Sequence, residues 1–280
     1  PGIIGLLRPE VAQLTGLSPG IPVSTGGGDN MMGAMGTGNL SPGRVTMSMG
    51  TSGTVYAYSD KPVVDPRGEI AAFCSSTGGW LPLMCTMNCT VTTEQTRHLL
   101  GTDLSDFERL VSGAPIGAEG VITLPFYNGE RTPNLPHARA CVLGLDTHNA
   151  RPENLLRSAL EGATFALRYG VDRLRTLGIE ASDVVLTGGG SGSATWRQAV
   201  ADICNVPVTM LQQDEGAAFG AALQALSVLE SCGPNELQQL ADDHLTKSNA
   251  MCCEPNNTAV KRYDEIYQCY QQSLGAITPL

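Results

Sequence analysis

Long apolar runs and an excess of positive charge are both missing from this chain of 280 residues. Its apolar segments are interrupted well before the ~20 residues that a membrane-spanning helix needs, as in residues 80–91, which contain Pro82 and Asn88. The 17 Lys and Arg residues are outnumbered by 27 Asp and Glu residues, which gives a formal net charge of −10. Because nucleic acids and anionic membranes are themselves negatively charged, we expect neither as a partner.

Paired metal-ligand or disulfide motifs are also lacking, although the chain has nine cysteines. Their number is odd, no Cys-x-x-Cys pair occurs and no secretory leader is seen, so we expect buried thiols in a reducing, cytoplasmic setting. Cys85 and Cys89 have the spacing of two ligands on one face of a helix, but no nearby histidine or further cysteine completes a tetrahedral site. The four histidines form no motif, and we predict no metal site.

One carboxylate, Asp29, directly follows the three glycines Gly26 to Gly28 and heads a segment of small residues. Glycines leave no side chains in the way and adopt backbone conformations closed to other residues, so a substrate can approach the main chain closely. An active-site base is often presented in this way. The alternative is an ordinary turn, because Asp is also a preferred residue at helix N-termini.

Two β-prone runs, residues 44–49 and 54–59, flank Gly50-Thr51-Ser52-Gly53 and predict a hairpin with a tight glycine-bounded turn. Residues 121–133 predict a buried strand that runs into a polar loop. Pro152 opens a long helix whose apolar residues recur at helical spacing until Gly178. Its charged residues are predicted to form a solvated face; they are Arg157, Glu161, Arg168, Asp172 and Arg175.

Further along, strands alternate with helices, as is typical of an α/β domain. The pattern predicts a strand at 183–187, a turn at Gly188 to Gly190, a helix at 194–204, a strand at 207–211 and helices at 215–229 and 235–242. A final amphipathic helix is predicted at 257–274, and its buried stripe consists of Tyr263, Ile266, Tyr267, Tyr270 and Leu274.

Three glycine-rich elements therefore stand in order along the chain: 26–29, 50–53 and 188–191. Glycine turns expose backbone N–H groups that phosphate oxygens can accept from, and Thr51 and Ser52 add hydroxyl donors. Taken singly, Gly50 to Gly53 is also compatible with a plain hairpin turn, and Gly188 to Gly190 with a simple reversal between strand and helix. Neither matches a Walker loop or the dinucleotide fingerprint.

The set of motifs resembles the FGGY carbohydrate kinases, members of the superfamily of sugar kinases, heat-shock chaperones and actin. Residues 47–53 look like the second phosphate loop of that family. Residues 186–191, with Trp196-Arg197-Gln198 and Ala201-Asp202, look like its adenosine motif, and residues 140–161 fit its second signature pattern. The resemblance spans nearly the whole chain and implies an α/β fold of the actin-like ATPase (ribonuclease H-like) type.

Within the family, the dipeptide Asp29-Asn30 and the segment Gly129 to Pro133 look most like the xylulokinase branch. The resemblance also exposes an absence, because the first phosphate loop, Asp-x-Gly-Thr, does not occur in the chain. Residues 1–40 would then be the end of a first, sugar-binding domain that carries the catalytic Asp, and residues 41–280 the second, nucleotide-binding domain. Alone, the 280 residues would lack most of the sugar pocket and are expected to be inactive.

The resemblance implies ATP-dependent phosphorylation of a sugar hydroxyl, most specifically D-xylulose to D-xylulose 5-phosphate, with Mg²⁺ as cofactor. Asp29 would accept the hydroxyl proton and bind the sugar together with Asn30. The phosphates of ATP would be held by Gly50, Thr51, Ser52 and Gly53. The adenosine would lie against Gly188, Gly189, Gly190 and Ser191.

For Glu130 and Arg131, a structural role is favoured over contacts in the cleft. Gly216, Ala217, Gly220 and Ala221 are small enough to border a base, but ordinary helix packing is the favoured interpretation.

Other interpretations stay open at this point. Another pentulose or polyol kinase of the same family fits the same motifs, and so does a catalytically silent fragment that binds a nucleotide or a sugar. A chaperone-like ATPase fits less well, since it would not carry Asp29-Asn30. The sequence leaves the oligomeric state open, a homo-oligomer included.

Overall fold

The computed structural model describes residues 2–212 and 216–277. The predicted helix that starts at Glu215 therefore begins outside the described residues, and its described part starts at Gly216. The strands are β1 Ile3–Leu6, β2 Pro22–Ser24, β3 Arg44–Met49, β4 Gly53–Ala57, β5 Ala71–Cys74, β6 Trp80–Thr86, β7 Ile122–Leu124, β8 Cys141–Leu143, β9 Asp183–Thr187 and β10 Val208–Thr209. The α-helices are α1 Pro9–Thr15, α2 Asp29–Gly36, α3 Thr90–Leu100, α4 Phe107–Gly113, α5 Pro152–Thr176, α6 Ala194–Cys204, α7 Gly216–Leu229, α8 Pro234–His244 and α9 Asn257–Ile277. Short 3₁₀ turns are η1 Leu104–Asp106, η2 Ala118–Gly120, η3 Gly189–Gly192 and η4 Asn249–Met251.

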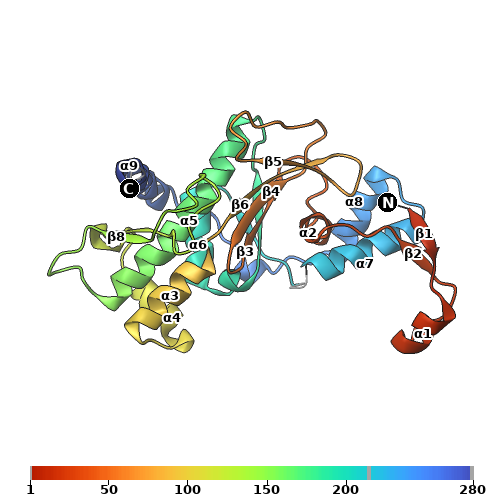
Figure 1. Cartoon of the computed structure of the whole chain (residues 1–280), viewed down its shortest axis with the longest axis horizontal. Helices are drawn as coiled ribbons and strands as arrows, with labels where there is room; N and C mark the ends of the chain where they lie inside the picture. Colours follow the sequence, from red (N-terminus) through yellow and green to blue (C-terminus); the bar gives the residue numbers. More distant parts are fainter. Residues whose placement is uncertain (1, 213–215, 278–280) are drawn as a thin grey trace.

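A six-stranded sheet with the order β10-β9-β3-β4-β6-β5 forms the centre of the molecule (Figure 1). The predicted hairpin is confirmed, since β3 and β4 pair antiparallel with Met49 opposite Gly53. β9 lies parallel to β3, and β10 lies parallel to β9. Parallel neighbours end at the same edge of a sheet, so the chain leaves β3 and β9 side by side, at Gly50 and Gly188.

One face of the sheet packs on the long helix α5 and on α6 and α9. Side chains alternate between the faces of a strand, and Val45, Met47 and Met49 of β3 all point into this large core. The predicted bounds of α5 are confirmed within two residues: Pro152 starts the helix, and Gly178 follows its end with a φ of 85°.

The charged residues of α5 correct the prediction of a solvated face. Arg157 and Glu161 are only 7% and 2% exposed. Arg157 Nε lies 2.8 Å from Glu161 Oε1, and Tyr263 of α9 hydrogen-bonds both side chains. The prediction was wrong here because α9 and α4 cover the side of α5 that an isolated amphipathic helix would leave to water. Asp172 and Arg175, further along, are partly exposed.

The opposite face of the sheet is covered by α2 and, through it, by α7 and α8 (Figure 1). Tyr56 of β4 points to this side and packs with Ala34 of α2. Helices α2 and α7 touch backbone to backbone: a methyl carbon built at Gly36 would lie 1.8 Å from the Gly216 carbonyl oxygen, and one built at Gly220 would lie 1.8 Å from that of Met32. Only glycine permits this approach at Gly36 and Gly220, so helix packing, as favoured, accounts for Gly220; a methyl carbon built at Gly216 would meet nothing closer than 3.9 Å.

The β1–α1–β2 segment lies at one end of the molecule, away from α3, α4 and α9 (Figure 1). β1 and β2 form a separate two-stranded sheet. This segment exposes apolar surface: Ile3, Ile4 and Leu6 are each more than half exposed, while Leu7 is half-buried.

Several elements between residues 60 and 120 were not predicted, among them β5, β6, α3 and α4. Cys85 and Cys89 do not share a helix face: Cys85 lies in β6, and Cys89 caps α3. In the described part of the chain, no group of three His, Cys, Asp or Glu side chains is placed to hold a metal ion. No helix of residues 2–212 and 216–277 is long and apolar enough to cross a membrane.

Candidate active site

Two of the three predicted glycine elements meet at the sheet edge where β3 and β9 end. A methyl carbon built at Gly188 would lie 2.9 Å from the carbonyl carbon of Met49 and 3.1 Å from the amide nitrogen of Gly50. One built at Gly190 would lie 3.0 Å from Met49 Cβ. Gly188 also has a φ of 84°, a conformation that favours glycine. The two turns therefore contact each other because Gly188 and Gly190 carry no side chains.

The Gly50–Gly53 turn has its carbonyl groups directed at the start of α3. Thr90 donates to the Gly50 carbonyl from both its N–H and its hydroxyl at 2.9 Å, and Cys89 N–H donates to the Thr51 carbonyl at 2.9 Å. The N–H groups and hydroxyls of Thr51 and Ser52 have no partner among residues 2–212 and 216–277, and both residues are exposed. Adjacent unpaired N–H groups in a turn make an anion-binding site.

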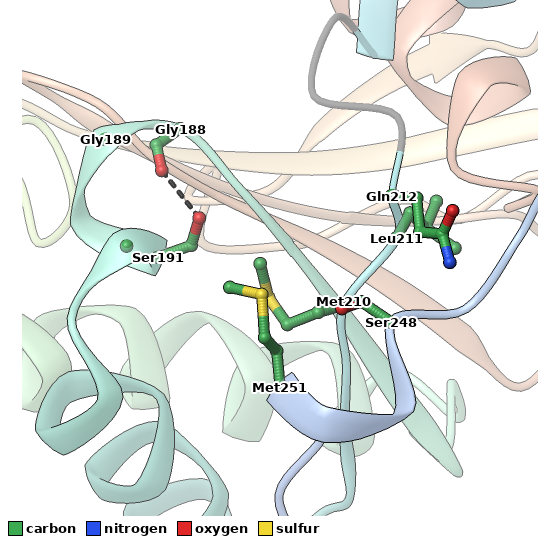
Figure 2. A pocket seen from close by; sticks show the side chains of 9 residues that line it. Gly188, Gly189, Ser191, Met210, Leu211, Gln212, Ser248 and Met251 are labelled. Carbon is green, nitrogen blue, oxygen red and sulfur yellow. Dashed lines mark hydrogen bonds between the residues drawn. The ribbon is translucent and has the colours of Figure 1, made fainter.

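The Gly188–Ser191 turn borders a cavity of about 640 Å³, a size typical of small-molecule sites. The turn is closed by a hydrogen bond from the Ser191 hydroxyl to the Gly188 carbonyl at 2.7 Å (Figure 2). Figure 2 shows the side chains of Met210 and Met251 extending toward the turn from the end of β10 and from η4. The remaining lining residues are Gly189, Gly192, Leu211, Gln212 and Ser248.

The third element, Asp29, is the first residue of α2, and Gly28 is the N-cap. Its side chain is exposed, and Asn30 donates to Asp29 Oδ1 from the backbone N–H at 2.8 Å and from Nδ2 at 3.2 Å. The Asp29 charge also acts on β6: burial raises the pKa of the Cys85 thiol, Arg131 opposes this, and the Asp29 carboxylate adds to it. Cys85 pairs with Thr54, which directly follows Gly53. Met31 of α2 and Cys85 pack against the same cluster of buried side chains, so the start of α2, with Asp29, lies on the face of the sheet to which Cys85 points.

Sequence and structure comparisons assign the chain to the same protein family. Residues 45–228 match the FGGY family of carbohydrate kinases, C-terminal domain. The chain belongs to the FGGY family. It is 47% identical over 274 residues to the xylulose kinase of Haemophilus influenzae, covering 98% of this chain and 55% of that protein. The FGGY chain thus spans about half the length of the curated relatives it matches.

Solved structures support the same family assignment. A xyloylose kinase from Brucella ovis superposes with a TM-score of 0.89 at 30% identity, over 99% of this chain and 56% of the other. The xylulose kinase from Bifidobacterium adolescentis gives a TM-score of 0.75 at 33% identity, over 90% and 47%. The predicted actin-like ATPase fold of FGGY sugar kinases is therefore confirmed.

Glu130 is buried and hydrogen-bonded within the protein, which agrees with the structural role favoured for it. It is 2% exposed and accepts hydrogen bonds from Met87 N–H at 2.6 Å, Arg131 N–H at 2.7 Å and Asn88 Nδ2 at 3.2 Å. Burial raises its pKa against these hydrogen bonds. Its hydrogen bond with Arg131 is to the backbone N–H and not to the guanidinium group. Glu130 fixes the loop from which Arg131 extends.

Sequence reasoning missed part of the cavity of this FGGY chain. Met210 to Gln212 follow β10, and the end of a third parallel strand was a signal that could have identified them. Ser248 and Met251 carry no motif. They reach the cavity because the segment around them pairs with the end of β10: Gln212 N–H donates to the Thr246 carbonyl at 2.9 Å, and Ser248 N–H to the Met210 carbonyl at 2.7 Å.

Proposed function

We propose that this chain is the nucleotide-binding and catalytic portion of a xylulose kinase, which phosphorylates D-xylulose with ATP to give D-xylulose 5-phosphate. The observation that carries the proposal is the meeting of two glycine turns and a cavity at one sheet edge, with the Asp29 carboxylate on the same side. The names of the relatives from Haemophilus influenzae and Bifidobacterium adolescentis support D-xylulose as the acceptor.

The residues around the two turns fit a nucleoside triphosphate. Gly50, Thr51, Ser52 and Gly53 would hold the phosphates, because the turn offers unpaired N–H groups and hydroxyls. Gly188 to Ser191 would border the ribose and base in the cavity, with Met210 and Met251 as apolar walls. ATP bound with Mg²⁺ supplies the transferable phosphoryl group and a counter-charge to it. Mg²⁺ bound through phosphate oxygens, water and few carboxylates needs no dedicated protein cage.

Asp29 would accept the proton of the sugar hydroxyl. Both donors of Asn30 bond to Oδ1, and Oδ2 has no hydrogen-bond partner in the described part of the chain. Oδ2 is therefore the oxygen available to the acceptor. A positioned carboxylate contributes roughly 100- to 10,000-fold to rate by taking such a proton. Asn30 would orient Asp29 and contact sugar hydroxyls through its own side-chain oxygen.

We also propose that residues 1–40 are the end of a first, sugar-binding domain and residues 41–280 a second, nucleotide-binding domain. Two observations support this division: β1 exposes apolar residues, and the relatives are about twice as long as this chain. Helix α2, although it precedes the boundary, packs on the second part. The 280 residues alone would bind nucleotide in the cytoplasm but would not turn over sugar.

The test is ADP release by the protein at its full natural length, from its initiator methionine, with D-xylulose, D-ribulose, L-ribulose, glycerol and gluconate as acceptors. We expect release to be fastest with D-xylulose. Faster release with another acceptor would overturn the proposed substrate while keeping the kinase. Nucleotide binding without release on any acceptor would overturn the kinase in favour of a binding protein.

A further inference from the structure

Helix α7 contains one large polar side chain that is completely buried, Gln224, at 0% exposed. Its neighbours along the helix are mostly alanine, leucine and glycine. The Gln224 amide pairs with both backbone groups of one residue in another element: Gly26 N–H donates to Oε1 at 2.7 Å, and Nε2 donates to the Gly26 carbonyl at 3.0 Å. A buried amide without partners would be costly, and this pairing satisfies it on both sides.

Gly26 starts the run of three glycines that ends at Asp29. Its φ is 68°, a left-handed conformation, and Gly27 and Gly28 follow. Three consecutive glycines have the largest backbone freedom of any such stretch. Gln224 joins this stretch to α7 at its first residue, and the α2 helix fixes it at its last, so the loop is held at both ends.

The same helix contacts α2 and leads back to the nucleotide cavity. Gly216 and Gly220 touch the α2 backbone at Gly36 and Met32. At its start, α7 lies beside the end of β9: a methyl carbon built at Gly216 would lie 3.9 Å from Cγ2 of Thr187, the residue before the cavity-lining Gly188. One helix therefore connects the wall of the nucleotide cavity to the loop that carries Asp29.

We propose that Gln224 is a positioning residue for phosphoryl transfer: by clamping Gly26 to α7 it fixes the Asp29 carboxylate relative to the nucleotide cavity. This inference rests on the proposed function. Gln224 is buried and is not among the residues that line the cavity, so its loss should affect the alignment of the reacting groups rather than the binding of ATP. Displacing a reacting group by about 1 Å can slow a reaction about 100-fold.

The first test compares Gln224→Met with the parent enzyme, both at full natural length. Methionine has a similar length and removes both hydrogen bonds, while Gly26 is exposed enough for water to replace them. We expect kcat to fall about 10- to 100-fold with KM for ATP within about 2-fold. Amide hydrogen exchange across residues 24–30 should become at least about 10-fold faster. The control is Ser227→Ala: Ser227 is also buried in α7, but its hydroxyl bonds only to its own helix, at the Gln224 carbonyl. An unchanged kcat in Gln224→Met would overturn the proposal.

A second variant, Gln224→Glu, separates positioning from packing. A neutral carboxyl group accepts from Gly26 N–H and donates to the Gly26 carbonyl, whereas an ionised one cannot donate. Burial favours the neutral form of a carboxyl group. We therefore compare kcat of Gln224→Glu with kcat of the parent at each pH. This ratio should increase as the pH is lowered from 8 to 6, while the same ratio for Gln224→Met stays constant. Two constant ratios would contradict the clamp.

Failure of the proposed function looks different from failure of the clamp. If the parent releases no ADP with any sugar, the kinase assignment fails. The hydrogen-exchange comparison still decides the clamp: faster exchange at residues 24–30 in Gln224→Met supports it, and unchanged exchange overturns it.

Discussion

The two faces of the central sheet are built in different ways. On the α5 face, large side chains such as Trp196, Phe165 and Tyr263 fill a continuous core, and a buried ion pair lies within it. On the α2 face, helices α2 and α7 meet through glycine backbones, and the completely buried amide of Gln224 bonds to the Gly26 loop. The first face stabilises the fold through the apolar area that its large side chains bury. The second fixes the position of Asp29 through the close contact between the backbones of α2 and α7.

This difference indicates a division of labour between the faces. Substitutions on the α5 face should change stability and leave turnover per folded molecule intact. Substitutions at the α2–α7 contact should change turnover even where the protein stays folded. The variants below, in the protein at its full natural length, test this division from the largest expected effect to the smallest.

Removing the cation of the buried pair should give the largest loss of stability. Arg157→Met leaves Glu161 buried without its guanidinium partner, and breaking such a pair typically costs about 3–5 kcal/mol. Chemical denaturation measures the loss, and kcat below the melting temperature should match the parent. The double variant Arg157→Met/Glu161→Gln should recover part of the stability, because a neutral amide needs no cation.

The stability of Arg157→Met should also depend on pH. Burial raises the pKa of Glu161 above the ordinary 4.5, and Arg157 opposes that rise. Without Arg157 the pKa rises further. A raised carboxyl pKa means that stability is fully present below about pH 4.5 and is lost as the pH rises through the folded-state value. The deficit relative to the parent should therefore be smallest near pH 4.5 and grow toward pH 8; a deficit independent of pH would contradict this account of Glu161.

At the contact between α2 and α7, Gly220→Ala should affect both stability and turnover. Its methyl group would lie 1.8 Å from the Met32 carbonyl oxygen, so the helices must separate. Overpacking of this kind costs about 1–3 kcal/mol. We expect kcat to fall as well, since Asp29 is carried by α2. Gly275→Ala is the matched control: it lies in helix α9 with open space around it, and it should be neutral or slightly stabilising. Equal kcat values for the two variants would contradict the division of labour.

Met251→Ala should have the smallest effect. Met251 is half-buried at the cavity wall and far along the chain from both glycine turns. Truncation removes apolar contact with a bound base, so KM for ATP should rise roughly 2- to 10-fold with kcat unchanged. Initial-rate kinetics at saturating sugar measures both constants. A fall in kcat with constant KM would place Met251 outside the adenosine site.

What the sequence predicted correctly rests on signals of short range. Gly50 to Gly53 between two β-prone runs predicts a hairpin, and Pro152 with 3.6-residue periodicity predicts α5, because both signals lie within the element itself. The meeting of two glycine turns was not predicted: it follows from the pairing of β3 with β9, since adjacent parallel strands end at one edge.

The features that the sequence did not reveal depend on distant partners. Arg157 was predicted to be solvated, but in the fold it bonds to Tyr263 and Glu161 and is buried. Gln224 and Gly26 are 198 residues apart, and no local pattern marks a glutamine in an alanine-rich helix as a clamp. Cys85 and Cys89 had a helical spacing that became irrelevant once Cys85 paired in β6.

The most direct test of the central claim is a comparison of Asp29→Asn with the parent, measuring sugar-dependent ADP release together with affinity for a non-hydrolysable ATP analogue. The Asp29 side chain is exposed and, among the residues that the structure describes, accepts hydrogen bonds only from Asn30, so stability should not change. The account predicts that release with D-xylulose falls at least about 100-fold while nucleotide affinity stays within about 2-fold. Turnover close to that of the parent, or a loss of nucleotide binding in parallel with turnover, would contradict Asp29 as the base held beside a separate nucleotide site.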